Sequence, residues 1–510
     1  MLANLLITWL LLPFAVAFLA ALQPRLARGL SLLASASTLA VGGWSLHGGS
    51  LSLDLIGPLG VQLAIDEVAA PFLLLNGLVV CAVLLERWRQ APPGPFPLLL
   101  PVLLGGLNSA FVMLDLVSLY VALEVVGITA FLLILQKRDI GQLWIALRYL
   151  LVGNAVMTIY LMGVALLYLH TGSFRLAALA TLPPTDSALP VIVAFLLVGL
   201  LTKAGVFLSG LWLPRTHAEA PADISALLSG VVVAAGLCPL LRLAALLPGL
   251  QPLLAWIGLA SALLGLVPAL LERDLKRLLA WSTVSQMGLV LLHPAIGGLY
   301  AFSHGLAKAA LFLVAAQAPS RNLALWPRQP LPRGLAIPLV VGGLSIAGAP
   351  PLLGYSAKQL LFTAPAQGFA GLSGPAAAVL LPLLGVGTAA VYARLVWVPV
   401  GGGPLTAAPG ALLLAILLAL AAWTLPGAAT PLADPASIAK AGAVLAAGGG
   451  IEALRRALAG RGSWPLPFPD LERLDDLLGG MAVVGVALMV ALLTTGLPFS
   501  LPSEVGPWRG

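Results

Sequence analysis

The chain has 510 residues, of which 60% are hydrophobic and only 9% are charged. Soluble domains carry about 25% charged residues, so this composition excludes a soluble globular protein and indicates an integral membrane protein. The net charge of +7 comes from Lys and Arg in short loops, which favours a role in membrane orientation over nucleic-acid binding. Cys81 and Cys238 stand singly in apolar segments, which excludes a disulfide framework, an Fe–S cluster or a CxxC site built from this chain alone.

Apolar runs long enough to span a bilayer recur along the chain. The first run, 2–22, lacks the basic flank and cleavage site of a signal peptide and is expected to be a membrane helix. The predicted helices are 2–22, 29–46, 68–86, 97–114, 116–136, 143–169, 188–212, 225–247, 252–271, 278–293, 296–318, 334–364, 376–398 and 408–426. Segments 436–449 and 478–498 are candidates for two further C-terminal helices, and the polar, partly alternating segment 47–66 predicts an external hairpin.

The loop charges predict an orientation. Loops after odd-numbered helices hold Arg25, Arg28, Arg87, Arg89, Lys137, Arg138, Arg215, Arg273, Lys276, Arg277, Arg321, Arg328 and Arg333. Loops after even-numbered helices hold almost none, Arg175 being the exception. The excess of positive charge in cytoplasmic loops therefore places the odd loops inside and the N-terminus outside.

Two helices are expected to be broken. One contains Lys203 and runs into Leu213-Pro214 and Pro221, and the other contains Gly348-Ala349-Pro350-Pro351 before Lys358. Proline removes a backbone donor, and such breaks are tolerated where protein or water satisfies the freed carbonyls. Interrupted helices at corresponding places in two halves are typical of inverted-repeat transporters.

Lone ionisable residues inside apolar stretches are the candidate functional residues. Glu124 is the only charge between Asp115 and Lys137, and Lys203 is the only one between Asp186 and Arg215. A charge near mid-membrane is costly and usually marks an ion or proton path. We expect Glu124 to pair with Lys203 and to modulate its proton affinity; the alternative is a purely structural ion pair.

The second half holds three further candidates. His304 and Lys308 are four residues apart, so they share one helix face, and imidazole suits a proton relay. Lys358 follows the proline break and is expected at a water-filled cavity, the alternative being a lysine that extends to the interface. His217 and His293 lie near predicted helix ends and are interpreted as structural, and Asp66 and Asp115 are interpreted as helix-end groups. The charged turn of Asp274, Lys276 and Arg277 is interpreted as a topological anchor, with gating as the alternative.

No motif for a nucleotide, flavin, haem or metal is found, so no cofactor is expected and any redox chemistry would belong to other chains.

Four ordered motifs resemble a known family. They are Leu201-Thr202-Lys203-Ala204-Gly205-Val206-Phe207 with its continuation to Leu227, Arg273 to Gln286, His304-x-x-x-Lys308 to Leu313, and Leu344 to Pro351. Over about residues 60–395 the chain resembles the antiporter-like membrane subunits of respiratory complex I, its photosynthetic and hydrogenase relatives, and Mrp-type cation/proton antiporters.

The resemblance implies an all-α membrane fold of about fourteen core transmembrane helices with two inverted five-helix repeats. Its parts would be the N-terminal helices and hairpin (1–96), helices four to eight (97–250), helices nine to thirteen (251–400) and the C-terminal helices with a short cytoplasmic loop (401–510). By position it implies that a proton relay is formed by Glu124, Lys203, His304, Lys308 and Lys358.

The chain departs from the family pattern at two places. The eighth-helix position that is often Lys or His aligns with Ala234, which removes one relay residue between the two half-channels. Either water or a different route bridges the gap, or the lateral coupling between the halves is weakened. Arg215-Thr216-His217 also departs from the usual acidic residue after Leu-Pro.

The expected function is that of a proton-translocating subunit in a multi-subunit membrane complex, a bacterial plasma membrane or thylakoid protein whose partners are other membrane subunits, protons and, in one alternative, Na⁺. Two drivers stay open: a redox-driven NAD(P)H-quinone oxidoreductase or hydrogenase-like complex, and an Mrp-type antiporter, which the Thr-Lys-Ala-Gly-Val-Phe run slightly favours. The complex I subunit type with a long C-terminal amphipathic helix is excluded. The third alternative is a non-conducting scaffold whose buried charges only pair structurally.

Overall fold

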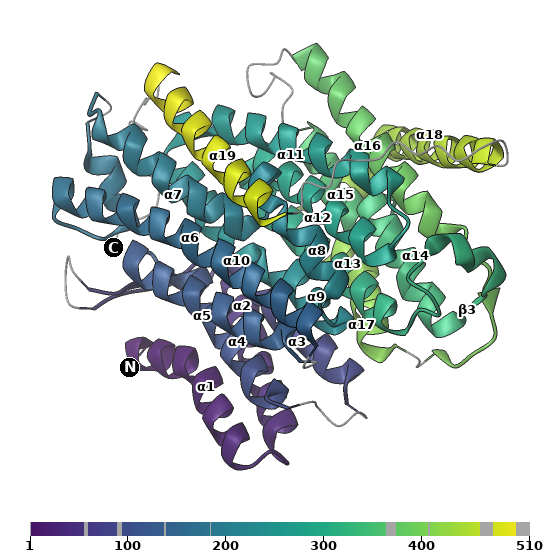
Figure 1. The fold of residues 1–510 in the computed structure, drawn as a ribbon, viewed down its shortest axis with the longest axis horizontal. Coiled ribbons are helices and arrows are strands. Elements are labelled where there is room, and N and C mark those ends of the chain that lie inside the picture. Colours follow the sequence, from purple (N-terminus) through teal and green to yellow (C-terminus); the bar gives the residue numbers. More distant parts are fainter. Residues whose placement is uncertain are drawn as a thin grey trace.

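The computed structural model describes residues 2–55, 60–88, 94–136, 139–183, 185–363, 374–405, 408–459 and 473–495. These residues form a bundle of closely packed helices in which chain order runs broadly from one end of the molecule to the other (Figure 1). The N-terminal helices, purple, lie at one end, and the green helices of residues 333–347 and 374–396 lie at the other, whereas the yellow C-terminal helix lies over helices of the first half.

Each of the fourteen predicted helical segments coincides with helix in the structure. The undivided helices up to the seventh segment are α1 (Leu2–Leu22), α2 (Ala27–Leu46), α3 (Ala70–Glu86), α4 (Phe96–Val112), α5 (Leu116–Ile134) and α6 (Ile140–Thr171). Those that follow are α11 (Gln251–Leu271), α12 (Leu275–Leu292), α13 (Pro294–Gln317), α16 (Gly374–Val396) and α17 (Pro409–Thr424). Short 3₁₀ turns η2 (Leu176–Thr181), η5 (Pro248–Leu250), η6 (Leu323–Arg328) and η8 (Thr430–Ala433) lie in the connections.

Three segments are divided. The seventh consists of α7 (Ala188–Ala204), the 3₁₀ turn η3 (Phe207–Gly210) and α8 (Trp212–Glu219). The eighth consists of α9 (Ala222–Leu227), the π-helical turn η4 (Leu228–Val232) and α10 (Ala234–Leu246). The twelfth consists of α14 (Arg333–Ala347) and α15 (Leu353–Thr363).

Ten helices among the described residues are long and apolar enough to cross a membrane, or eleven if the pair that bends by 43° at η3 is one span. Four further apolar helices, α3, α4, α14 and α17, are 15 to 17 residues long. The chain is therefore a multi-pass helical membrane protein, and the count of fourteen spans stays a prediction.

The hairpin expected within 47–66 is present. Strand β1 (Leu51–Asp54) pairs antiparallel with β2 (Gln62–Ile65), and Leu51 lies opposite Ile65. The amide of Leu114 donates to the carbonyl of Gln62 at 2.8 Å, which fixes the hairpin to the end of α4. A second, two-residue pairing joins β3 (Leu331–Pro332) to β4 (Val400–Gly401) in parallel.

Contacts between loops sort them into two sets. The hairpin, the loop after α4 and the loop after α6 meet through Arg175, which pairs with Asp54. On the other side, Arg87 after α3 pairs with Asp223 at the start of α9 and donates to Gln136 after α5. Even-numbered loops thus contact even ones and odd contact odd, as alternating membrane crossings require, and Asp54 offsets the charge of the exceptional Arg175.

The break in the seventh helix lies earlier than the prolines predicted. Gly205 adopts a left-handed conformation (φ 69°), and its amide donates to carbonyls in the last turn of α7, a glycine-terminated helix end. Pro214 instead lies in the first turn of α8, where its missing N–H breaks no helical hydrogen bond. Arg215, expected in a loop, therefore lies within α8. The twelfth-helix break is where it was predicted, with Gly348 at φ 90° ending α14.

Two kinds of local contact, a helix-capping aspartate and an arginine bonded to a helix end, occur twice along the chain. Asp115 caps the start of α5 and Asp274 caps the start of α12, and each forms an isolated bridge, to Arg175 and Asn322 respectively. Arg242 of α10 donates to the carbonyl of Phe111 in the last turn of α4. Likewise Arg394 of α16 donates to the carbonyls of Ala269 and Leu270 in the last turn of α11 and to that of Glu272, which follows it.

Two C-terminal helices follow the core. Helix α18 (Pro435–Ala459) packs against α16 and is longer than the predicted 436–449, because the helix continues as far as Ala459. Helix α19 (Leu474–Thr495) packs against α7 and η3, far from α18 (Figure 1). Residues 460–472 lie outside the described part of the chain.

Candidate functional site

Lys203 and Glu124 meet where α7 ends. Lys203 lies in the last turn of α7, and its Nζ is 3.4 Å from Oε1 of Glu124 on α5. A cation is favoured at the C-terminal end of a helix, where carbonyl groups lack helical partners. The predicted pairing is therefore confirmed as a contact, whereas its role in proton transfer stays a prediction.

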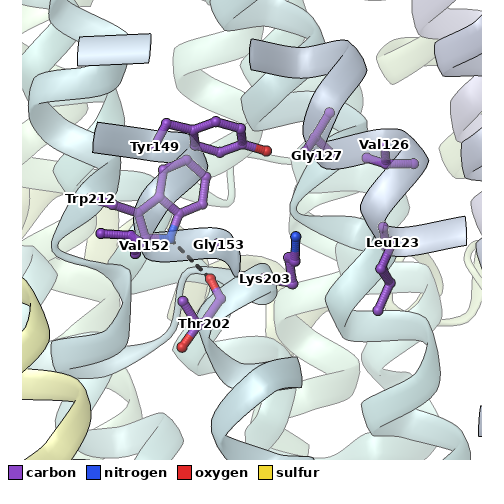
Figure 2. A pocket seen from close by; sticks show the side chains of 11 residues that line it. Leu123, Val126, Gly127, Tyr149, Val152, Gly153, Thr202, Lys203 and Trp212 are labelled. Atoms are coloured by element: carbon purple, nitrogen blue, oxygen red, sulfur yellow. Dashed lines mark hydrogen bonds between the residues drawn. The ribbon is translucent and has the colours of Figure 1, made fainter. Parts of the chain in front are cut away.

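A cavity surrounds the Lys203 side chain (Figure 2). Its walls are mostly apolar, and the space open to water-sized molecules is about 20 Å³, enough for about one water. Two glycines provide part of this room: a Cβ at Gly127 would lie 3.1 Å from Nζ of Lys203, and one at Gly153 would lie 3.5 Å from it. Any larger residue at Gly127 would press on the amine.

An aromatic pair closes one side of this cavity. The rings of Tyr149 and Trp212 lie with centroids 5.2 Å apart. Trp212, the first residue of α8, donates its indole N–H to the carbonyl of Thr202 at 2.9 Å, drawn as the dashed line in Figure 2. The second half of the broken helix thus supplies a hydrogen bond to the last turn of the first half.

Lys308 lies deep in the second half. It is fully buried on α13, and its Nζ donates to the carbonyl of Leu279 at 2.7 Å and to the hydroxyl of Tyr392 at 2.8 Å. The Tyr392 hydroxyl is also 2.8 Å from that of Ser282. Because Tyr392 accepts from Lys308, its own proton is free to go to Ser282.

His304 and Lys358 share a second cavity, which is lined largely by polar residues: Gln286, Tyr300, Ser303, His304, Ser345 and Lys358 together with Ile346, Gly354 and Ala357. The space open to water-sized molecules is about 10 Å³. Nζ of Lys358 is 3.4 Å from the carbonyl of Ala347 at the helix break. Both ring nitrogens of His304 lack a hydrogen-bond partner within the described residues.

The five predicted residues therefore fall in three places. Glu124 and Lys203 lie together, His304 lines the cavity of Lys358, and Lys308 bonds to Leu279 and Tyr392 on neighbouring helices. The i, i+4 spacing predicted a shared face for His304 and Lys308 but not these different surroundings. Lys358 is 4% exposed, so the alternative of a lysine that extends to the interface is not what the structure shows.

Sequence reasoning missed several polar residues. Tyr392 carries no motif that would have singled it out, and Gln286 accepts a 2.7 Å hydrogen bond from Tyr300 at the second cavity. His217 was interpreted as structural because it lies near a helix end. It is in fact fully buried, stacks on Phe312 with ring centroids 5.0 Å apart, and has no hydrogen-bond partner for either nitrogen in the described chain.

The position of Ala234 is as apolar as the alignment suggested. Ala234 is 2% exposed and is the first residue of α10, directly after η4 and Val233. Its neighbour Ala235 lines the cavity of Lys203, and so does Val232. Among the described residues no group of three His, Cys, Asp or Glu side chains is placed to hold a metal ion.

Interrupted helices in a polytopic helical bundle are a common feature of membrane transporters. The family model described as "NADH:quinone oxidoreductase/Mrp antiporter, TM" matches residues 114–371, about half of the chain, and the chain belongs to this family.

Individual relatives agree with that assignment. The chain is 32% identical over 408 residues to an NADH-quinone oxidoreductase subunit from Desulforudis audaxviator, with 71% of this chain and 80% of the relative covered. It is 30% identical over 340 residues to a Na(+)/H(+) antiporter subunit from Alkalihalophilus pseudofirmus, covering 60% of this chain and 67% of the relative. A chain in the structure of the Mrp complex from Dietzia sp. DQ12-45-1b shares the fold with a TM-score of 0.70 at 22% identity, over 96% of this chain and 99% of that one.

Proposed function

We propose that this chain is a proton-translocating subunit of a multi-subunit membrane complex, in which Lys203 takes up and releases the proton and Glu124 modulates it. The observation that carries the proposal is the 3.4 Å contact between these two side chains at a helix break, beside a cavity with room for about one water. A purely structural ion pair needs neither the helix break nor the cavity. A lysine that exchanges a proton needs access for water, which the cavity provides, and a charged partner, which Glu124 provides.

The distance between the charges suits modulation. At 3.4 Å the two charges attract by about 5 kcal/mol at an effective dielectric near 20, so moving them about 2.5 Å further apart changes the energy of the charged lysine by about 2 kcal/mol. Movement of α5 relative to α7 would then release or recapture a proton. His304, Lys308 and Lys358 would carry the charge through the second half.

The proposal includes a fold of about fourteen spans arranged as two inverted repeats, α4 to α10 and α11 to α16. The repeated caps at Asp115 and Asp274, and the repeated helix-end bonds of Arg242 and Arg394, support the repeat. An odd number of crossings in each repeat makes the second copy enter the membrane from the opposite side, which inverts it.

Charge-neutralising variants separate transport from scaffolding. Lys203→Ala should abolish ΔpH formation by native membrane vesicles while protein abundance stays near normal, and Lys203→Arg should fail nearly as badly because guanidinium keeps its proton. Glu124→Gln should reduce flux strongly, and Glu124→Asp only in part.

A structural ion pair predicts the opposite pattern. Each single neutralisation would lower abundance, since a stranded buried charge costs about 3–5 kcal/mol, whereas Lys203→Met combined with Glu124→Gln would restore both protein and function. Normal ΔpH formation by that double variant would refute the proposal.

The two driving reactions are distinguished by the energy source. Vesicles supplied with NADH test the redox-driven alternative, and the same vesicles given a Na⁺ pulse test the antiporter alternative. Relatives named as NADH-quinone oxidoreductase and as Na(+)/H(+) antiporter subunits support both. Co-purified hydrophilic redox subunits would decide for the first.

A further inference from the structure

Lys203 and Lys308 belong to different halves, and nothing at Ala234 can carry a proton between them. The segment that precedes Ala234 is placed between the two lysines. Val232 of η4 lines the cavity of Lys203, while Ser229 of the same turn lies 2.8 Å from the hydroxyl of Thr283 on α12. One π-helical turn therefore touches the surroundings of both halves.

Thr283 and Lys308 share one hydrogen-bond acceptor. The Thr283 hydroxyl donates to the carbonyl of Leu279 at 3.0 Å, and Nζ of Lys308 donates to the same carbonyl at 2.7 Å. Two donors on one acceptor oxygen lie close enough for a single water molecule to bridge them. Ser229, Thr283 and Lys308 thus lie in succession around the Leu279 carbonyl, and all three side chains are fully buried.

The backbone is built to bring the eighth helix this close. A Cβ at Gly305 of α13 would lie 2.5 Å from the carbonyl oxygen of Gly230, so only glycine allows this approach. π-helical turns are rare and occur frequently at functional sites. Gly230 follows Ser229 in η4, and Gly305 is less than one turn before Lys308 on α13, so the same crossing holds Ser229 near Lys308.

A hydroxyl pair can pass a proton because each member both donates and accepts. With Thr283 donating to Leu279, Ser229 must be the donor to Thr283, since a hydroxyl has one proton. In the reversed arrangement Thr283 donates to Ser229, and the Leu279 carbonyl keeps its bond from Lys308. Neither arrangement strands the Leu279 carbonyl, so the hydroxyl pair can reverse without leaving that buried acceptor unsatisfied.

We propose that Ser229 and Thr283 form a hydroxyl bridge that conducts protons between the Lys203 cavity and Lys308, in place of the ionisable residue that Ala234 lacks. A water molecule from that cavity gives a proton to Ser229 as it takes one from Lys203, and Ser229 passes its own proton to Thr283. Thr283 then passes its proton through one further water molecule to the amine of Lys308. The inference rests on the proposed function and adds the route by which the halves communicate. Ser229 and Thr283 act by positioning and relaying a proton, and Lys203 and Lys308 remain the groups that hold it.

Isosteric removal of one hydroxyl tests the bridge. Thr283→Val keeps the shape and should lower the rate of ΔpH formation by native membrane vesicles about a hundredfold or more, the low end of what a positioned proton-transfer group contributes. Thr283→Ser keeps the hydroxyl and should retain most activity. Ser229→Ala should match Thr283→Val, and the double variant should be no worse than either single one, because both interrupt one chain.

Ser285→Ala is the matched control. Ser285 lies two residues further along α12, is 3% exposed, and donates to the carbonyl of Ala262 at 2.9 Å, away from the bridge, so its loss should leave flux unchanged. Protein level and complex assembly are measured for every variant. Should Thr283→Val reduce assembly, Ser229→Ala gives the decisive flux value.

Three results would overturn the bridge. They are full flux in Thr283→Val or Ser229→Ala, a loss in Thr283→Ser as large as in Thr283→Val, or an equal loss in Ser285→Ala. Lys203→Ala is measured in parallel. If this variant forms a normal ΔpH, the proposed function itself is refuted. If Lys203→Ala forms no ΔpH while Thr283→Val keeps full flux, only the bridge is refuted.

Discussion

At the scale of single residues, Arg242 shows how a buried charge is made tolerable. Its guanidinium donates to both carboxylate oxygens of Asp66, at 2.6 and 2.9 Å, and to the carbonyl of Phe111 at 3.0 Å. Asp66 in turn accepts from the amide of Ala69 at the start of α3. One side chain on α10 thus joins the ends of α3 and α4.

Removing this guanidinium should destabilise the bundle. Arg242→Met would leave Asp66 without its bidentate partner and should cost about 3–5 kcal/mol, because a buried charge would be stranded. Thermal unfolding of the detergent-purified protein measures the loss. The control is Arg175→Met, whose pair with Asp54 is part-exposed and is worth about 0–1 kcal/mol. Similar melting temperatures for the two variants would contradict this account.

Isolation in an apolar run marked the lysines and Glu124 as candidates, because a charge is costly in the membrane. No such signal exists for Ser229, Thr283 or Tyr392. Ser, Thr and Tyr occur throughout membrane helices at little cost, and only the packing of α12 against its neighbours shows which of them meet. Hydroxyl connections therefore require the structure.

At the scale of the element, the broken helices depend on glycine rather than proline. The prolines after Lys203 correctly indicated a discontinuity, but they placed it too late. Gly205 is the residue that ends α7, and Pro214 merely suits the first turn of α8. From sequence alone a glycine in a chain with 55 of them carries little information, so the exact break could not be located.

Gly205→Ala should be more harmful than an equivalent change elsewhere. Two costs add there: an alanine at φ 69° is strained by about 1–2 kcal/mol, and its Cβ would lie 2.4 Å from Cδ1 of Leu213. Gly172 has nearly the same φ, 68°, with nothing within 4 Å of an added Cβ, so Gly172→Ala shows the strain alone.

Thermal unfolding should rank wild type, Gly172→Ala and Gly205→Ala in order of falling stability. ΔpH formation should fall only in Gly205→Ala, because that clash displaces α8 relative to Lys203. Equal behaviour of the two alanine variants would mean that the close packing at Leu213 does not matter.

At the scale of the whole molecule, the loops separate into two sets that do not mix. Arg321 pairs with Asp274, and Lys276 donates to the carbonyls of Ala218 and Ala220, so the loops after α8, α11 and α13 share one side. The alternation of loops rich in Lys and Arg with loops that hold almost none predicted this division, because each membrane crossing takes the chain to the opposite side. The hairpin was likewise predictable from its alternating pattern, whereas the packing of α19 on α7 was not, since an apolar helix carries no mark of its partner.

Which set faces the cytoplasm is testable by labelling. In a background with Cys81 and Cys238 replaced by alanine, a cysteine at Arg273 should react with an impermeant thiol reagent only from the cytoplasmic side. A cysteine at Ser52 in the hairpin should react only from outside. Reversed labelling would overturn the orientation, and labelling of both from one side would overturn the helix count.

The π-helical turn η4 changes how residues can be matched along the eighth helix. An α-helix advances about 100° per residue, so the one extra residue in a π turn rotates everything after it by about that angle. The alignment with the family pattern places Ala234 at the position that is often Lys or His, yet Ala235 is the residue that lines the Lys203 cavity. Deleting one residue between Leu228 and Val232 would wind the segment back to an ordinary helix, and the angular register of α10 would then present a different set of side chains to both lysines.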